Sequence, residues 1–126
     1  MLHGTGTPLN DEAESTALGT VFGGLDPSPY MTAIKSMTGH TAGASGLHSL
    51  VAAVDVLRTG TIPPTVYLDD PVEAVAGFRL VRGTAERASA PLRIAQIDSF
   101  GFGGLNAVAV VERVDGPPAS EEGAGQ

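Results

Sequence analysis

The 126-residue chain contains no cysteine. Disulfide bonds, thiolate metal sites and a cysteine nucleophile are therefore excluded within these residues. Tryptophan is also absent, and aromatic residues make up only 5% of the chain. The core must consequently be built from aliphatic side chains and closely packed backbone, for which the 17 glycines leave room.

Basic residues and long apolar runs are scarce as well. The seven Lys and Arg residues are scattered, and the formal net charge of -7 argues against binding to nucleic acid. The longest apolar stretches, near residues 50–57 and 107–111, are too short to span a bilayer. The N-terminus lacks the charged segment and apolar run of a signal peptide. We therefore expect a globular, cytoplasmic protein that binds neither nucleic acid nor membrane.

The most informative stretch is residues 34–46, which leads from an apolar segment into a helix. Residues 30–34 are predicted to form a buried strand. A helix is predicted over 42–58, from apolar residues at helical spacing: Leu47, Leu50, Val51, Val54 and Leu57. Thr41 or Ser45 is expected to supply the N-cap oxygen. Lys35 and His40 stand five positions apart on the strand-to-helix turn, which is typical of a functional site.

The remaining pattern predicts an α/β fold, a mixed β-sheet packed with helices. Asn10 or Asp11 is expected to cap a helix that ends near Phe22, before Gly23 and Gly24. Further extended segments are predicted at residues 65–68, 78–82, 92–97 and 107–114. Residues 1–114 would form the folded domain, and residues 115–126, poor in apolar side chains, a disordered acidic tail.

Three motifs carry candidate chemistry. HGTGTP holds His3, KSMTGH holds Lys35 and His40, and DSFGFGG begins at Asp98. Two neutral imidazoles can each donate an N–H to one thioester oxygen and stabilise the enolate formed when a carboxylate leaves as carbon dioxide. A lysine close to one imidazole would fix its protonation state. A phenylalanine between glycines, Phe102, is able to swing as a gate over a pocket.

HGTGTPLND, KSMTGHTAGASG and DSFGFGGLNA, in this order, resemble the C-terminal half of a β-ketoacyl synthase of the thiolase fold. The KSMTGH motif is most similar to the elongating condensing enzymes of type II fatty acid and polyketide synthesis. The resemblance implies that His3 and His40 assist malonyl decarboxylation and that Lys35 supports them. It also implies substrate-binding residues: Thr5 and Thr7 on a phosphopantetheine arm, and Phe100 and Phe102 at the acyl pocket.

The resemblance further implies partners. The nucleophilic cysteine would come from a separate N-terminal half, as in a split enzyme, and acyl carrier protein would deliver substrate on its phosphopantetheine arm. No covalently bound cofactor and no metal is expected, and the pair would form a higher-order dimer. The sequence departs from the family at two positions. Ser49 replaces an acid found in several relatives, and Asp98 replaces the usual Asn.

Other interpretations remain open at this stage. The pattern lacks a strand before His3, as expected of a chain that starts in the middle of a fold, so a truncated, non-catalytic module for docking or structure is one alternative. A cysteine-free decarboxylase of malonyl thioesters is another. Locally, Thr5 and Thr7 are also explained as hydroxyls bonding their own turn. The acidic residues 11–14 are explained as a helix start.

Overall fold

The computed structural model describes residues 1–114, and the predicted tail lies outside the described residues. The helices are α1 Pro8–Phe22, α2 Lys35–Thr38 and α3 Ser45–Thr59, with short 3-10 turns η1 Ala42–Ala44, η2 Glu73–Val75 and η3 Phe102–Gly104. The strands are β1 Tyr30–Met31, β2 Thr61–Ile62, β3 Arg79–Leu80, β4 Glu86–Arg87, β5 Ile94–Phe100 and β6 Asn106–Glu112. Within these residues, no helix is long and apolar enough to cross a membrane. The α/β class is confirmed.

Helix α1 begins earlier than predicted. Its first residue is Pro8, and Thr7 before it is extended. Proline suits this first position because its missing N–H would have no helical partner there. Asn10 and Asp11 therefore lie inside the helix, and the prediction that one of them caps it is wrong. The end at Phe22, followed by Gly23, agrees with the sequence.

Helix α3 is confirmed, but its expected N-cap is not. A 3-10 turn precedes it, and neither Thr41 nor Ser45 makes a side-chain cap bond. Instead, the Thr41 N–H donates to Ser45 Oγ at 3.0 Å. At the other end, Gly60 adopts a left-handed φ of 73° and ends the helix.

The N-terminal part of the buried face of α3 is made of small side chains. Ser45, Ser49 and Ala53 are buried together with Val56 and Leu57. The apolar residues Leu47, Val51 and Val54 are instead 64%, 68% and 53% exposed. Small residues let α3 approach β5 closely, and a Cβ added at Gly46 would meet Ser99. We call Leu47, Val51 and Val54 the outer face of α3.

Strands pair in three two-stranded ladders within the described residues: β1 with β3 in parallel, and β2 with β4 and β5 with β6 antiparallel. β1 stops at Met31, short of the predicted residues 30–34, because Ile34 is already helical and opens α2. Residues 65–68 form no strand; Thr65 makes an isolated bridge to Arg82, and Tyr67 has a φ of 58°. The strands predicted at residues 92–97 and 107–114 are confirmed as β5 and β6, with ends that differ from the prediction by one to three residues.

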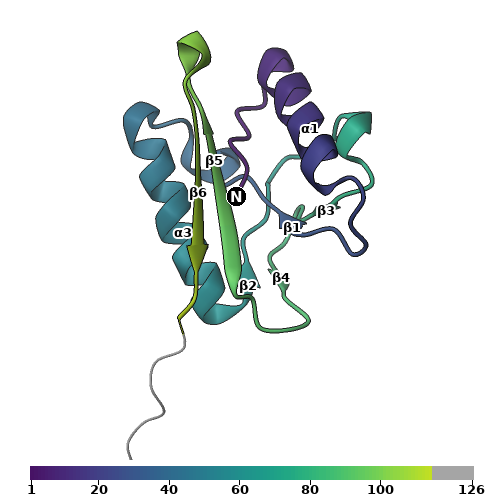
Figure 1. Cartoon of the computed structure of the whole chain (residues 1–126), viewed down its shortest axis with the longest axis vertical. Helices are drawn as coiled ribbons and strands as arrows, with labels where there is room; N and C mark the ends of the chain where they lie inside the picture. The colour runs from purple at the N-terminus through teal and green to yellow at the C-terminus, as the bar shows by residue number, and fades with distance from the viewer. Residues whose placement is uncertain (115–126) are drawn as a thin grey trace, which may run out of the picture.

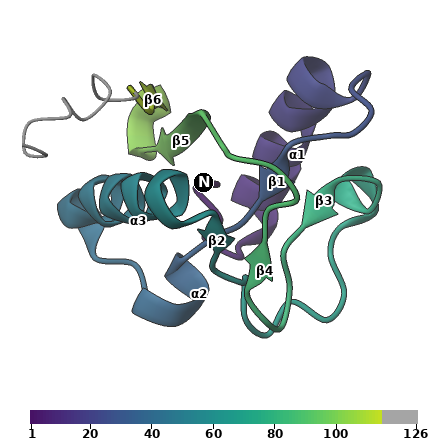
Figure 2. The same ribbon diagram turned by 90° about the horizontal axis from the view of Figure 1, so that it is seen from below.

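The first two residues connect two of these ladders, β5–β6 and β1–β3, by backbone hydrogen bonds. The Met1 α-amino group donates to the Gln96 carbonyl at 2.7 Å, and the Asp98 N–H donates to the Met1 carbonyl at 3.0 Å. The Leu2 N–H donates to the Thr32 carbonyl at 2.8 Å. Both views place the N-terminus between β5 and β1 (Figures 1 and 2). Residues 1–2 thus occupy part of the strand position before His3.

Two apolar clusters cover opposite faces of β1. Leu18 of α1 packs with Met31, whereas Val56 of α3 packs with Val81 and the half-buried Tyr30. Neighbouring residues of a strand point to opposite faces, so Tyr30 and Met31 serve different clusters. Figure 2 shows α1 and α3 on either side of the strands. This packing positions the loops that carry His3, Lys35 and His40.

Candidate active site

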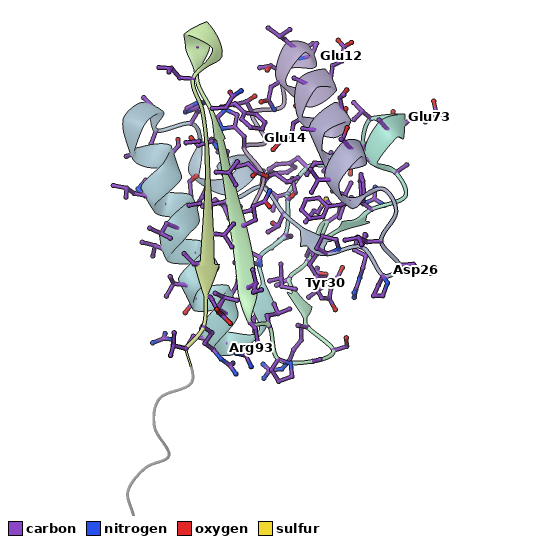
Figure 3. All side chains as sticks on the ribbon, in the orientation of Figure 1. Glu12, Glu14, Asp26, Tyr30, Glu73 and Arg93 are labelled. Carbon is purple, nitrogen blue, oxygen red and sulfur yellow. The ribbon has the colours of Figure 1, made fainter. Side chains whose placement is uncertain are left out.

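His3 begins a loop whose backbone is hydrogen-bonded to a side chain of α1. The Glu14 carboxylate accepts the His3 N–H at 2.7 Å and the Gly4 N–H at 2.9 Å. Asn10 Nδ2 donates to the same carboxylate at 3.1 Å. In Figure 3, Glu14 lies on the inner side of α1, whereas Glu12 points outward. Sequence reasoning missed this role of Glu14; the i, i+4 spacing of Asn10 and Glu14 was the available signal.

Gly4 brings this loop close to the segment before α2. Its φ is +51°, and a Cβ built there would overlap the Cβ of Ala33. Only glycine combines this backbone conformation with so close an approach. The contact places the His3 loop beside Lys35, two residues beyond Ala33.

Lys35 fixes the hydrogen-bonding state of His3. Its Nζ donates to the His3 carbonyl at 2.5 Å and lies 3.4 Å from His3 Nδ1. An ammonium group has donors only, so Nδ1 is the acceptor of this contact. In the neutral ring, the proton then resides on Nε2, which becomes the donor of His3.

His40 is held in the same tautomer by different groups. Its Nδ1 accepts the Ala42 N–H at 3.1 Å and lies 3.1 Å from Ser45 Oγ. A ring nitrogen that accepts a backbone N–H carries no proton, so the proton of neutral His40 is on Nε2. Ala42 adopts a left-handed φ of 49° to deliver its N–H. Ser45, predicted as a helix cap, instead orients His40.

The two imidazoles lie together with one aromatic ring. The ring centroids of His3 and His40 are 5.7 Å apart, with an interplanar angle of 84°. The Phe100 ring centroid is 5.6 Å from that of His3. His3, His40, Lys35 and Phe100 therefore form one cluster, as the motifs predicted. Where two Nε2–H groups converge, they are able to bind a single oxygen anion.

The electrostatics favour uncharged His3. Burial lowers the pKa of His3, and the charge of Lys35 and the neighbouring His40 lower it further, while Asp98 acts in the opposite direction. Burial also lowers the pKa of Lys35, against an opposing effect of Glu14. Glu14 is thus the acid that acts on Lys35 in this chain. Ser49, where the resemblance implies an acid in several relatives, is buried and uncharged.

Asp98, where the resemblance implies an Asn, is only 6% exposed. Gln96 Nε2 donates to Asp98 Oδ1 at 2.8 Å. Residues 96, 98 and 100 lie on one side of β5, the side on which Phe100 meets His3. The substitution therefore places a buried carboxylate, which raises the pKa of His3, where an amide would be neutral.

The predicted substrate-binding residues do not all lie at the cluster of His3, His40 and Lys35. Thr5 and Thr7 bond each other, Oγ1 to Oγ1, at 3.1 Å, on the exposed loop. Thr5, but not Thr7, lines a cavity of about 460 Å³ beside Lys35 and His40. Phe102 lies at the tip of the β5–β6 hairpin with its side chain fully exposed. The structure does not bring Phe102 to the histidines.

Comparison with known proteins gives a consistent assignment. Residues 1–69 match the family profile described as "Beta-ketoacyl synthase, C-terminal domain". The chain is 38% identical over 112 residues to 3-oxoacyl-(acyl-carrier-protein) synthase 1 of Escherichia coli K12, covering 89% of this chain and 26% of that enzyme. It is also 38% identical to a hybrid PKS-NRPS synthetase of Pyrenochaetopsis sp, covering 94% of this chain and 3% of the synthetase.

Solved structures share the fold. A type II PKS ketosynthase, solved in complex with its acyl-carrier protein and bound to the hexaketide, matches with a TM-score of 0.82 and 28% identity, over 90% of this chain and 27% of that chain. A β-ketoacyl synthase from Burkholderia phymatum matches with a TM-score of 0.79 and 32% identity, over 90% of this chain and 26% of that chain. The chain spans about a quarter of such single-function relatives.

Proposed function

The chain belongs to the β-ketoacyl synthase family, as a C-terminal domain of the thiolase-like fold, and on that premise we propose that it supplies the decarboxylation half of a condensing active site. The complete site would join a malonyl unit to an acyl thioester, both delivered by acyl carrier protein. The paired imidazoles of His3 and His40, 5.7 Å apart and both with Nδ1 engaged as an acceptor, carry the proposal.

In this reaction the malonyl thioester loses its carboxylate as carbon dioxide. The electrons of the broken C–C bond pass into an enolate, whose negative charge gathers on the thioester oxygen. The Nε2–H groups of His3 and His40 donate to that oxygen and stabilise the charge as it develops. The enolate carbon then attacks the acyl thioester carbonyl on a cysteine, and the thiolate leaves. Lys35 acts as a positioning residue through His3.

The nucleophilic cysteine belongs to an N-terminal ketosynthase half outside these 126 residues, because they contain none. We propose that this Cys-bearing half is a partner that completes the site, and that two such pairs form a dimer. The outer face of α3 and the exposed β6 side chains Val108 and Val110 are among the apolar surfaces available for burial in the pair.

Acyl carrier protein is the proposed carrier of both substrates. A related ketosynthase has been solved in complex with its carrier protein, which supports this assignment. The phosphopantetheine arm would exchange the mutual hydrogen bond of Thr5 and Thr7 for bonds to its own amides and hydroxyls. Phe100, against His3, would border the acyl group, and Phe102 would reach the pocket only by movement of the hairpin tip.

Reconstitution with the Cys-bearing half tests the proposal. His40→Ala should abolish condensation of malonyl- and acyl-carrier protein without weakening assembly of the pair. His48→Ala is the control histidine, since His48 is exposed and, within residues 1–114, its ring is linked to His40 only indirectly, through Thr41 and Ser45. Condensation that survives His40→Ala would show the assignment of His40 to be wrong.

A second candidate is decarboxylation alone. Both proposed enolate-stabilising donors lie in this chain, and the cysteine does not, so the chain would release carbon dioxide from malonyl-carrier protein without forming a C–C bond. Incubating the isolated chain with malonyl-carrier protein separates the two. Acetyl-carrier protein formed by the chain, and lost in His3→Ala, would favour decarboxylation alone. No product from the isolated chain would exclude it and leave condensation by the pair, or a non-catalytic docking module.

A further inference from the structure

A series of hydrogen-bonding side chains leads from His40 to the surface. Ser45 Oγ lies 3.1 Å from His40 Nδ1 and 3.2 Å from Thr41 Oγ1. Thr41 Oγ1 in turn lies 3.2 Å from His48 Nδ1. Ser45 is only 5% exposed, whereas Thr41 and His48 are exposed. A hydroxyl group both donates and accepts, so the direction of these contacts is decided by the groups at the ends of the series.

The inner end of the series fixes its direction. His40 Nδ1 accepts the Ala42 N–H at 3.1 Å, so this nitrogen carries no proton and has nothing to donate to Ser45. Ser45 must therefore donate to Nδ1, because the opposite arrangement would set two lone pairs against each other at 3.1 Å. The Nδ1 lone pair is then shared by two donors, the Ala42 N–H and the Ser45 O–H.

The number of hydroxyl protons extends this direction outward. Ser45 has one O–H, which it donates to His40, so its oxygen accepts from Thr41 both the backbone N–H at 3.0 Å and the hydroxyl at 3.2 Å. The single O–H of Thr41 is thereby used as well, and His48 Nδ1 must donate to Thr41 Oγ1. His48 therefore carries a proton on Nδ1, the nitrogen that is unprotonated in His40.

We propose that Ser45 and Thr41 are positioning residues for His40, which form a directed relay of hydroxyl donors that holds the His40 proton on Nε2. This role rests on the proposed function, in which the Nε2–H of His40 donates to the thioester oxygen. Ala42 is exposed, so its N–H competes with water for Nδ1, whereas the buried Ser45 hydroxyl is shielded from solvent. Hydrogen bonds in series polarise one another, so the Thr41 O–H strengthens the donation by Ser45.

His48 lies at the outer end of the relay and is not needed for it. Thr41 is exposed, so a water molecule is able to donate to its oxygen when the His48 ring is removed. His48→Ala should therefore leave the direction of the relay and the rate of condensation unchanged. The ring is instead a spectroscopic reporter, because its tautomer records the direction in which the Thr41 hydroxyl points.

The tautomers of the two rings test the direction without an assay of activity. In the 126-residue chain, 15N NMR at a pH where both imidazoles are neutral should show His40 protonated on Nε2 and His48 on Nδ1. Ser45→Ala removes the acceptor of the Thr41 hydroxyl, so His48 should lose its single tautomer although Thr41 itself is unchanged. A proton on Nε2 of His48 in the unsubstituted chain would overturn the relay, and so would a His48 tautomer that Ser45→Ala does not change.

A second substitution tests the relay through a residue at the surface, where folding is not at risk. Thr41→Val keeps the shape and the backbone N–H of residue 41 but removes its hydroxyl, so His48 should populate both tautomers while His40 stays protonated on Nε2. His48 that kept its proton on Nδ1 alone would show that Thr41 does not select the tautomer. Ser15→Ala is the control, since Ser15 is a helical serine, 6% exposed, whose hydroxyl donates to the Glu12 carbonyl. It should change neither ring.

The reconstituted pair tests the positioning role. Ser45→Ala should lower kcat for condensation by about tenfold, the effect of losing one hydrogen bond to the reacting histidine, and leave KM for malonyl-carrier protein unchanged. Thr41→Val should lower kcat less, because Ser45 still donates to His40. An unchanged kcat in Ser45→Ala would overturn the positioning role. An inactive unsubstituted pair in which both rings have the expected tautomers would instead contradict the proposed function alone.

Discussion

At the scale of single residues, His3 is placed among charges of opposite sign. Lys35 contacts both its carbonyl and its Nδ1, whereas the buried Asp98 acts on it from β5. Lys35 lowers the pKa of His3 and Asp98 raises it. The proposed enolate stabilisation requires a neutral imidazole, and two substitutions should shift the pKa of His3 in opposite directions.

Lys35→Met should raise the pKa of His3, because it removes the neighbouring positive charge while keeping a side chain of similar length. It also frees Nδ1, so that the tautomer is no longer fixed. We expect decarboxylation by the reconstituted pair to fall by about ten- to a hundredfold. Titration of the His3 ring by 15N NMR measures both the pKa and the tautomer. An unchanged titration curve would contradict the assigned contact.

Asp98→Asn, which restores the amide of the family, should lower the pKa of His3 further below its ordinary value of 6.5. Because the folded pKa is already depressed, the unfolded chain binds a proton first as the pH falls below 6.5. Stability that is present above this pH is thus lost progressively on acidification. The His3 contribution to this loss should extend to lower pH in Asp98→Asn and shrink in Lys35→Met, measured by urea unfolding from pH 7.5 to 5.

At the scale of elements, α1 anchors the His3 loop through one side chain. Glu14→Ala leaves the N–H groups of His3 and Gly4 without their acceptor and should cost about 1–3 kcal/mol of unfolding free energy. Glu14→Gln should cost less, since its one oxygen still accepts. Glu12→Ala is the control on the outer side of the helix and should change stability by less than about 0.5 kcal/mol. Equal urea midpoints for Glu14→Ala and Glu12→Ala would refute the anchor.

The sequence predicted the elements better than their ends and faces. Helical periodicity located α3, but could not tell that Ser49 and Ala53, rather than Leu47 and Val51, are buried. That choice depends on how closely β5 approaches, a long-range contact. Similarly, the motifs located His3, His40, Lys35 and Phe100, which lie together. The role of Glu14 as an acceptor for the His3 loop was not predicted, because an acidic residue near the start of a helix is explained equally well by the helix dipole.

At the scale of the whole molecule, apolar surface is unevenly exposed. Val51→Lys, on the outer face of α3, should leave the stability of the isolated chain within about 0.5 kcal/mol, because its side chain is 68% exposed. Assembly with the Cys-bearing half should weaken at least tenfold, about 1.4 kcal/mol. Val21→Lys, on α1 and 63% exposed, is the matched control. Isothermal calorimetry compares the two; equal affinities would remove α3 from the proposed contact.

β6 has a further consequence for the biology of such a pair. Within residues 1–114 it bonds only β5, and its run Ala107–Val111 contains neither charge nor proline along the open edge. Edges of this kind template pairing with other chains. If the chain pairs with a separate Cys-bearing half as proposed, synthesis in excess of that half would leave this edge uncovered and open to pairing between copies of the chain. Balanced amounts of the two halves would then limit self-association.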